Sequence, residues 1–288
     1  MNINDIELKI KMISKFLSKE NIDENYEKIR NTVSNIITPT LVSHVEITRM
    51  FLFRARKLSD IPNFDNLSIH DILLPPENIT EVGRGNLKNK PVLYCALDPV
   101  TAIHEVEIKE EDYFLLGCFE LLENYIDSEQ EKTAVIGITK TESKDDPLDR
   151  IAYGITSNFL YTEFTREITE RNQNRYYVTN AIVDHLFNKM KYRSIIYPSV
   201  INNERKNILL SPESIPERIA FGYMYVCKMI EVGLNQFKAH ILRSLAQYET
   251  KGELKWRNLD MTRTFNYESE GPHDQAKVVI KHMSKHLE

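Results

Sequence analysis

The sequence predicts an α+β fold, and three observations support that class. The chain has 288 residues, which is long enough to bury a substantial core. Its hydrophobic fraction of 42% and charged fraction of 27% are ordinary for a globular protein. Short apolar runs and amphipathic stretches follow one another without a regular strand–helix alternation. A doubly wound parallel sheet is therefore not expected.

The first segment predicts helices. Residues 4–36 are polar and charged, with apolar residues at helical spacing such as Ile6, Ile10 and Ile13. The sequence Thr38-Pro39-Thr40 is typical of a helix end. We interpret residues 1–48 as an N-terminal helical extension containing one or two amphipathic helices.

Strands and further helices are predicted along the rest of the chain. Apolar or alternating runs predict strands over residues 50–57, 92–97, 113–121, 133–139, 194–200, 207–210 and 219–229. Helices are predicted over 157–170 and 175–191, and from Asp98 to about residue 109. In the last of these, Asp98 is a suitable N-cap and Pro99 suits the first helical position. The tail from Asn235 is expected to hold one helix and then a strand.

Composition excludes several classes of function. The net charge of -5 and a pI of about 6.0 give no global positive field for a nucleic acid. The cysteines Cys95, Cys118 and Cys227 form no CxxC pair, so neither a disulfide framework nor a zinc knuckle is indicated. The start of the chain lacks the apolar core of a signal peptide, and no apolar run reaches membrane-spanning length. A cytoplasmic protein without a membrane partner is expected.

The common catalytic motifs are missing from the sequence. The turn GRGN at residues 83–86 is not a GxGxxG dinucleotide fingerprint. The chain has no phosphate-binding GxxxxGK[ST] loop and no HExxH pair, and no metal site is expected. Ser199 has no GxSxG elbow around it, which argues against an α/β-hydrolase. Individually, Arg54, Arg84, Tyr94, Glu105 and Ser199 each have an ordinary structural explanation.

Together these residues resemble the signature of the RES-domain family. The chain carries FLFRAR with Arg54, GRGN with Arg84, PVLY with Tyr94, TAIHEV with Glu105 and IIYPSV with Ser199. Asn207 in KNILL matches the family's polar residue before a late strand. The resemblance spans about residues 50–225. The chain departs from the family pattern at Gly85, where many relatives have a bulky residue, and in length, since stand-alone toxins of the family are shorter.

This resemblance implies a fold, an activity and partners. The fold would be similar to that of ADP-ribosyltransferases, a split β-core with surrounding helices. The NAD-binding catalytic domain would cover residues 49–230, with residues 231–288 a helix/strand extension packed on it. Such proteins are toxins of toxin–antitoxin pairs that cleave the nicotinamide–ribose bond of NAD+, with water or phosphate as acceptor. NAD+ would be the substrate, without a further cofactor. A cognate antitoxin or regulatory protein is the expected partner. Whether the protein forms homo-oligomers stays open.

The resemblance also implies a role for each residue. Glu105, Arg54 and Tyr94 form the expected catalytic set: the carboxylate stabilises a cationic ribose, and the ring stacks on nicotinamide. Arg54 and Arg84 would bind the pyrophosphate by paired, charge-assisted hydrogen bonds. Ser199 and Asn207 would orient the ribose or the amide group.

Two other functions stay open at this stage. Some family members transfer ADP-ribose to a protein, and that activity usually has a carboxylate or glutamine two residues before the catalytic glutamate. Here this position is Ile103, which weighs against transfer. A catalytically silent binding module is the other alternative, and the intact set of polar residues argues against it.

Overall fold

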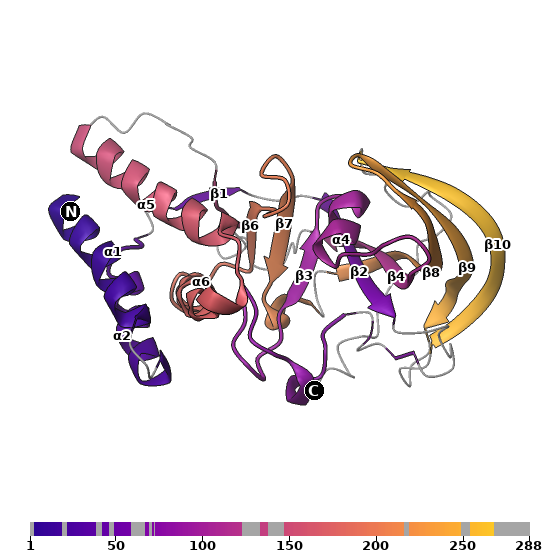
Figure 1. The fold of residues 1–288 in the computed structure, drawn as a ribbon, viewed down its shortest axis with the longest axis horizontal. Coiled ribbons are helices and arrows are strands. Elements are labelled where there is room, and N and C mark those ends of the chain that lie inside the picture. The colour runs from indigo at the N-terminus through magenta and orange to yellow at the C-terminus, as the bar shows by residue number, and fades with distance from the viewer. Residues whose placement is uncertain are drawn as a thin grey trace. The chain divides into compact units, whose positions relative to one another are not determined.

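The structure is a computed structural model that describes residues 3–18, 22–38, 42–45, 49–58, 67–68, 71, 73–122, 133–137, 147–215, 219–248 and 254–267. The chain forms two compact units. The first unit is Met1–Glu46, Glu77–Val92 and Glu129–Glu204. The second unit is Ile47–Pro76, Leu93–Ser128 and Arg205–Glu288. Each unit combines helices with strands, which confirms the α+β class (Figure 1). The boundaries predicted at residues 48 and 230 stay a prediction.

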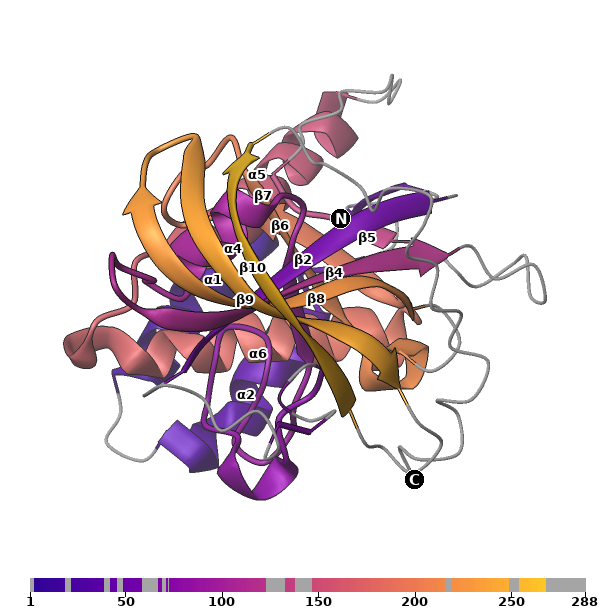
Figure 2. The ribbon, with the colours of Figure 1, turned by 90° about the vertical axis from the view of Figure 1, so that its right-hand side faces the viewer.

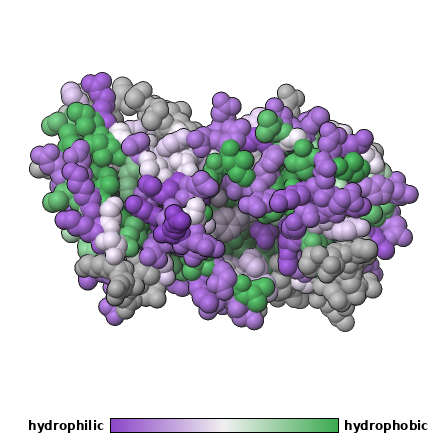
Figure 3. All heavy atoms as spheres, in the orientation of Figure 1, coloured by the Kyte–Doolittle hydropathy of each residue, from purple (hydrophilic) through white to green (hydrophobic). Residues whose placement is uncertain are grey.

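Helices dominate the first unit. They are α1 (Ile3–Leu17), α2 (Ile22–Ser34), α5 (Pro147–Thr165) and α6 (Tyr176–Asp184), and α6 continues as a π-helix over His185–Lys189. The short 3-10 helices η3 (Glu77–Ile79) and η4 (Glu170–Arg175) belong to the same unit. The N-terminal helices are confirmed, and Ile6 and Ile13 supply the buried side of α1. Hydrophobic side chains also reach the surface over α1 and the start of α5 (Figure 3), among them Leu8, Met12, Leu148 and Ile151.

Three short strands complete the first unit. β1 (Ser43–Val45) pairs antiparallel with β5 (Thr133–Val135), and β5 pairs parallel with β6 (Ser194–Pro198). Every residue of β5 and β6 is buried, as expected for strands predicted from continuous apolar runs. The last residues of the strand predicted over 133–139 lie outside the described residues.

Strands dominate the second unit. They are β2 (Arg49–Leu58), β3 (Leu93–Ala96), β4 (Tyr113–Leu122), β7 (Lys206–Leu210), β8 (Ile219–Val232), β9 (Gln236–Tyr248) and β10 (Leu254–Asn266). Their order in the sheet is β7-β3-β2-β4-β8-β9-β10, and all described neighbours pair antiparallel. Figure 2 shows β8, β9 and β10 as long, strongly curved strands.

The core of the second unit lies between this sheet and helix α4 (Pro99–Glu105). Val100 and Ile103 of α4 are fully buried in the same cluster as Phe53 and Phe114. Burying an aromatic or aliphatic side chain of this size contributes about 1.5–3 kcal/mol, so the helix is anchored firmly by its apolar side. The polar end of α4 is thereby held in a fixed place on the sheet.

The helix predicted after Asn235 is wrong, because residues 236–248 form strand β9. This segment contains many good helix formers, and local propensity favours a helix. However, Phe237, Ala239 and Ile241 are almost completely buried at alternate positions, which is the spacing of a strand. Pairing with β8 on one side and β10 on the other overrides the local preference.

Candidate active site

Helix α4 carries Glu105, and its start is built as the sequence predicts. The Asp98 side chain accepts a hydrogen bond from the backbone N–H of Thr101 at 2.8 Å, and Pro99 occupies the first turn. This N-cap satisfies a backbone donor that the helix itself leaves unpaired. The cap therefore fixes where the helix begins, two residues after strand β3.

The end of α4 differs from the prediction. The helix ends at Glu105, not near residue 109, because Glu107 adopts a left-handed conformation with φ of 51°. The N–H of Glu107 donates to the carbonyl of His104 at 3.0 Å, and that of Ile108 to Ile103 at 3.3 Å. This is the hydrogen-bond pattern of a Schellman motif, whose left-handed position is usually glycine. Since Glu107 is not glycine, the sequence did not reveal the stop.

Glu105 is held by Asn207. Asn207 is 4% exposed on β7, and its side-chain Nδ2 donates to Oε1 of the exposed Glu105 at 2.7 Å. A carboxylate at the C-terminal end of a helix is disfavoured by the helix dipole, so this donor stabilises it where it lies. A buried amide thus fixes the direction of a carboxylate that solvent and ligands can reach.

Tyr94 lies near this pair on the sheet. It is half-buried on β3, and Ala96, two residues along the strand, lies directly opposite Asn207. Because strand side chains alternate, Tyr94, Ala96 and Asn207 share one face of the sheet. Cys95 faces the other way, and burial raises the pKa of its thiol to about 12. Burial also raises the pKa of the other two cysteines, so all three are free, buried and unreactive thiols.

Arg54 has few partners among the residues that the structure describes. It alternates with Phe53 on β2, and its Nη1 donates to the backbone carbonyl of Tyr94 at 3.4 Å. Its Nε is buried without a hydrogen-bond partner, and no carboxylate pairs with it among the residues described. Burial lowers the pKa of the guanidinium, because the charged form is poorly solvated there. Such a group favours an anion as its missing partner.

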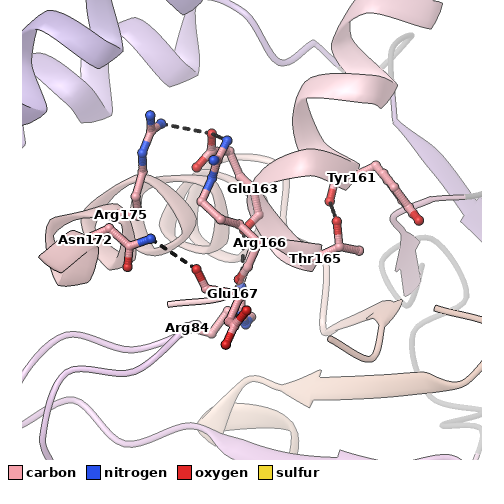
Figure 4. Close-up of polar contacts among 8 residues, drawn as sticks. All are labelled: Arg84, Tyr161, Glu163, Thr165, Arg166, Glu167, Asn172 and Arg175. Atoms are coloured by element: carbon pink, nitrogen blue, oxygen red, sulfur yellow. Dashed lines mark hydrogen bonds and ion pairs between the residues drawn. The ribbon is translucent and has the colours of Figure 1, made fainter. Parts of the chain in front are cut away.

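Arg84, in the first unit, is by contrast already engaged. Its Nη1 and Nη2 donate to the backbone carbonyls of Glu163 at 3.2 Å and Arg166 at 3.0 Å. These carbonyls lie at the C-terminal end of α5, where helix carbonyls lack intrahelical partners. Figure 4 shows Arg84 below the end of this helix. The turn itself is closed by a bridge between Gly83 and Asn86.

A buried carboxylate beside this turn was missed by the sequence analysis. Glu163 is 4% exposed, and its Oε1 pairs with Nη1 of Arg175 at 3.1 Å and Nη2 of Arg166 at 3.5 Å (Figure 4). Burial raises the pKa of Glu163, although Arg175 and Arg166 act in the opposite direction. In the sequence, Glu163 and Arg166 stand three residues apart at the end of an amphipathic stretch, which predicts an ion pair on a helix. This spacing does not predict that the carboxylate is buried.

Ser199 also belongs to the first unit. It is 1% exposed directly after β6, and its Oγ accepts a hydrogen bond from the backbone N–H of Ile201 at 3.2 Å. This is the local turn geometry that short hydroxyl side chains favour. The structure thus brings Glu105 and Asn207 into contact on the face of the sheet that carries Tyr94. Arg54 reaches only the backbone carbonyl of Tyr94, because Phe53 lies opposite Ala96 and the alternating Arg54 side chain therefore lies on the other face, with Cys95. Arg84 and Ser199 lie in the other unit, each with its own local contacts.

The candidate site residues all lie within a stretch that matches a known protein family. The model of the RES domain family matches residues 53–222, which is more than half of the chain and includes all six of these residues. The chain belongs to the RES domain family. A structure of the M. tuberculosis MbcT–MbcA toxin–antitoxin complex aligns with this RES protein at a TM-score of 0.39 and 10% identity. The alignment covers 67% of this chain and 91% of that chain. No curated protein matches the chain.

Two features are absent from the described part of this RES protein. Among those residues, no group of three or more histidine, cysteine, aspartate or glutamate side chains is placed to hold a metal ion. No helix within the same ranges is long and apolar enough to cross a membrane.

Proposed function

We propose that this RES domain protein binds NAD+ and cleaves its nicotinamide–ribose bond. The observation that carries the proposal is the exposed carboxylate of Glu105, oriented by the buried amide of Asn207 at 2.7 Å. Breaking a glycosidic bond builds positive charge on the sugar ring, and a fixed carboxylate stabilises that charge. A carboxylate fixed before the reaction stabilises the transition state without reorganising.

Arg54 supports the choice of a phosphate-containing substrate. A partly buried guanidinium that has no anionic partner among the described residues is unfavourable, and a pyrophosphate would supply two anionic groups for it. Arginine binds phosphate in a paired geometry that lysine cannot match. Tyr94, partly exposed on the sheet face it shares with Asn207, is suited to stack on the nicotinamide ring.

The chemistry needs few groups. Nicotinamide is cationic in NAD+, so it takes the electron pair of the C1′–N1 bond and leaves as a neutral molecule. The oxygen of water or phosphate then bonds to C1′ of the ribose, and any proton on that oxygen passes to solvent. No strong general acid is required, which agrees with a site built around one carboxylate, that of Glu105. Roles of Arg84 and Ser199 in binding stay predictions, and the two bonds that Arg84 already donates favour a positioning role.

Cleavage is favoured over transfer of ADP-ribose to a protein. Transferases of this kind usually place a polar side chain two residues before the catalytic glutamate to orient the acceptor. Here that residue, Ile103, is 0% exposed in the core of the second unit. It therefore offers an incoming protein neither a polar group nor access.

We further propose a biological role from the family. A RES protein that destroys NAD+ would arrest growth in the cytoplasm, and a cognate antitoxin would hold it inactive until needed. The role in the cell requires the activity, so the activity is tested first.

The test is consumption of labelled NAD+ by the purified protein, with and without phosphate. We expect free ADP-ribose, or its phosphorylated form when phosphate is present. Glu105→Gln should reduce the rate at least about 100-fold, the scale of losing one fixed charge-stabilising group. Glu107→Gln is the matched control, because it neutralises an exposed carboxylate two residues away and should keep the parent rate. Labelled protein would indicate transfer, and equal rates for the parent and Glu105→Gln would refute the proposal.

A further inference from the structure

A turn beyond the family match contacts both elements that carry the Glu105–Asn207 pair. Gly233, Leu234 and Asn235 join β8 to β9 and lie after residue 222, where the match ends. Arg205, two residues before Asn207, donates hydrogen bonds to Leu234 and Asn235 of this turn. His104, immediately before Glu105, contacts Gly233 of the same turn.

Arg205 makes the stronger of the two attachments. It is 5% exposed, and its Nη2 donates to the carbonyl of Leu234 and to Oδ1 of Asn235, the latter at 2.9 Å. Its guanidinium carbon lies 4.8 Å from the centre of the Tyr267 ring, and the backbone N–H of Tyr267 donates to the carbonyl of Asn235 at 2.9 Å. No carboxylate pairs with Arg205 among the residues described. A buried arginine is thus used here to hold a turn, with neutral acceptors and an aromatic ring as its partners.

His104 attaches the same turn to helix α4. Its Nε2 lies 3.1 Å from the carbonyl of Gly233 and, since a carbonyl only accepts, Nε2 donates. Gly233 itself closes the turn, because its N–H donates to the carbonyl of Gln236 at 2.9 Å. A side chain at Gly233 would place its Cβ 3.1 Å from that carbonyl oxygen, so the turn fits glycine closely.

We propose that Arg205, His104 and the turn over residues 233–235 form a clamp that positions the carboxylate of Glu105 against Asn207. This inference rests on the proposed function and deepens it. The clamp joins the end of α4 to the start of β7, and these two elements each contribute one member of the hydrogen-bonded pair. The apolar side of α4 anchors the helix on the sheet, and the clamp adds polar contacts at its exposed end, next to Glu105. A displacement of about 1 Å at a reacting group can reduce a rate about 100-fold.

The first test compares Arg205→Leu with Arg205→Lys. Leucine removes both donated bonds, whereas lysine keeps a charge that can reach one acceptor. We expect the kcat for NAD+ cleavage to fall about 30-fold in Arg205→Leu and less in Arg205→Lys, with KM within about twofold of the parent. KM is spared because the clamp holds the carboxylate that acts in the transition state, and not the groups that bind the phosphates.

Two further pairs of variants test the clamp with less risk of unfolding the protein than Arg205→Leu. His104→Gln retains a donor near the position of Nε2 and should keep the parent kcat, whereas His104→Leu should lower it about fivefold. Tyr267 is 43% exposed, so its replacement disturbs little of the core. Tyr267→Ala should lower kcat about threefold, and Tyr267→Phe, which keeps the ring over Arg205, should not.

A double-mutant cycle separates a positioning role from a general structural one. In a Glu105→Gln background, Arg205→Leu should cause little additional loss, because the carboxylate that it positions is already gone. An equal loss in both backgrounds, or an unchanged kcat in Arg205→Leu protein that melts as the parent does, would overturn the clamp. A parent protein that consumes no NAD+ would overturn the proposed function instead.

Discussion

Arg54 and Arg84 come from the same family signature and were expected to bind the same pyrophosphate, yet their surroundings are opposite. Arg54 has a buried Nε without a partner and one long bond from Nη1 to a backbone carbonyl. Arg84 donates both terminal nitrogens to carbonyls at the end of α5. Among the described residues, Arg54 thus keeps hydrogen-bond donors available for a ligand, whereas Arg84 already donates both terminal nitrogens to the protein.

The difference shows how the partners of a charged residue decide its function. An unsatisfied buried guanidinium destabilises the empty protein and gains most when an anion binds. A guanidinium that satisfies the last carbonyls of a helix stabilises the fold with or without a ligand. We therefore propose that Arg54 binds the ligand and expect Arg84 to act mainly on stability, and variants of the two arginines separate these roles.

The largest expected effect is that of Arg54→Met on activity. Losing two charge-assisted hydrogen bonds to phosphate should lower kcat/KM for NAD+ about 100-fold, mostly through KM. The free energy of unfolding should stay the same or rise by about 1 kcal/mol, because the variant no longer buries an unpaired charge. Steady-state kinetics and urea denaturation of the same preparation measure both values. A large loss of stability with unchanged KM would reverse the assignment.

Arg84→Met should show the opposite profile. Two carbonyls at the end of α5 lose their donor, so the free energy of unfolding should fall by about 2 kcal/mol. For a protein of this size that lowers Tm by about 4–8 °C, which thermal unfolding followed by circular dichroism detects. KM for NAD+ should stay within about twofold of the parent. Arg84→Lys serves as the control and should recover part of the stability, since one amine replaces the two-pronged donor.

Glu163 should make the stability of the region around Arg84 depend on pH. Burial raises its pKa in the folded protein, so the folded state binds its proton at a higher pH than the unfolded chain does. Its contribution to stability is therefore greatest below the unfolded pKa of about 4.3 and is lost as the pH rises through the folded pKa. In denaturant titrations, the stability of the parent relative to Glu163→Gln should fall as the pH rises from about 4 through the folded pKa of Glu163. If the stability difference between the parent and Glu163→Gln instead increased with pH, the attraction of Arg175 and Arg166 for the carboxylate would outweigh the effect of its burial.

The smallest effect concerns the helix end that presents Glu105. Glu107→Gly removes the strain of a left-handed glutamate but adds backbone entropy to the unfolded chain. The net result should be a gain of about 0.5 kcal/mol in the free energy of unfolding. Glu110→Gly, at an exposed position without a positive φ, is the matched control and should destabilise by a similar amount. A loss of stability in Glu107→Gly would exclude strain at this helix end.

The sequence by itself determined the features that depend on neighbouring residues. The N-terminal helices, strands β2 to β4 and the Asp98–Pro99 helix start were all predictable, because periodicity and capping act over a few residues. The family was also recognisable, because its motifs are short and keep their order along the chain.

Only the tertiary structure decided the rest. The bond from Asn207 to Glu105 joins residues 102 positions apart, and the bonds that engage Arg84 span about 80 positions. Strand β9 forms because β8 and β10 pair with it, against its own helix preference. Whether a polar side chain is free to bind a ligand depends on the partners that folding brings to it. For Arg54 and Arg84, those partners come from segments that the local sequence does not specify.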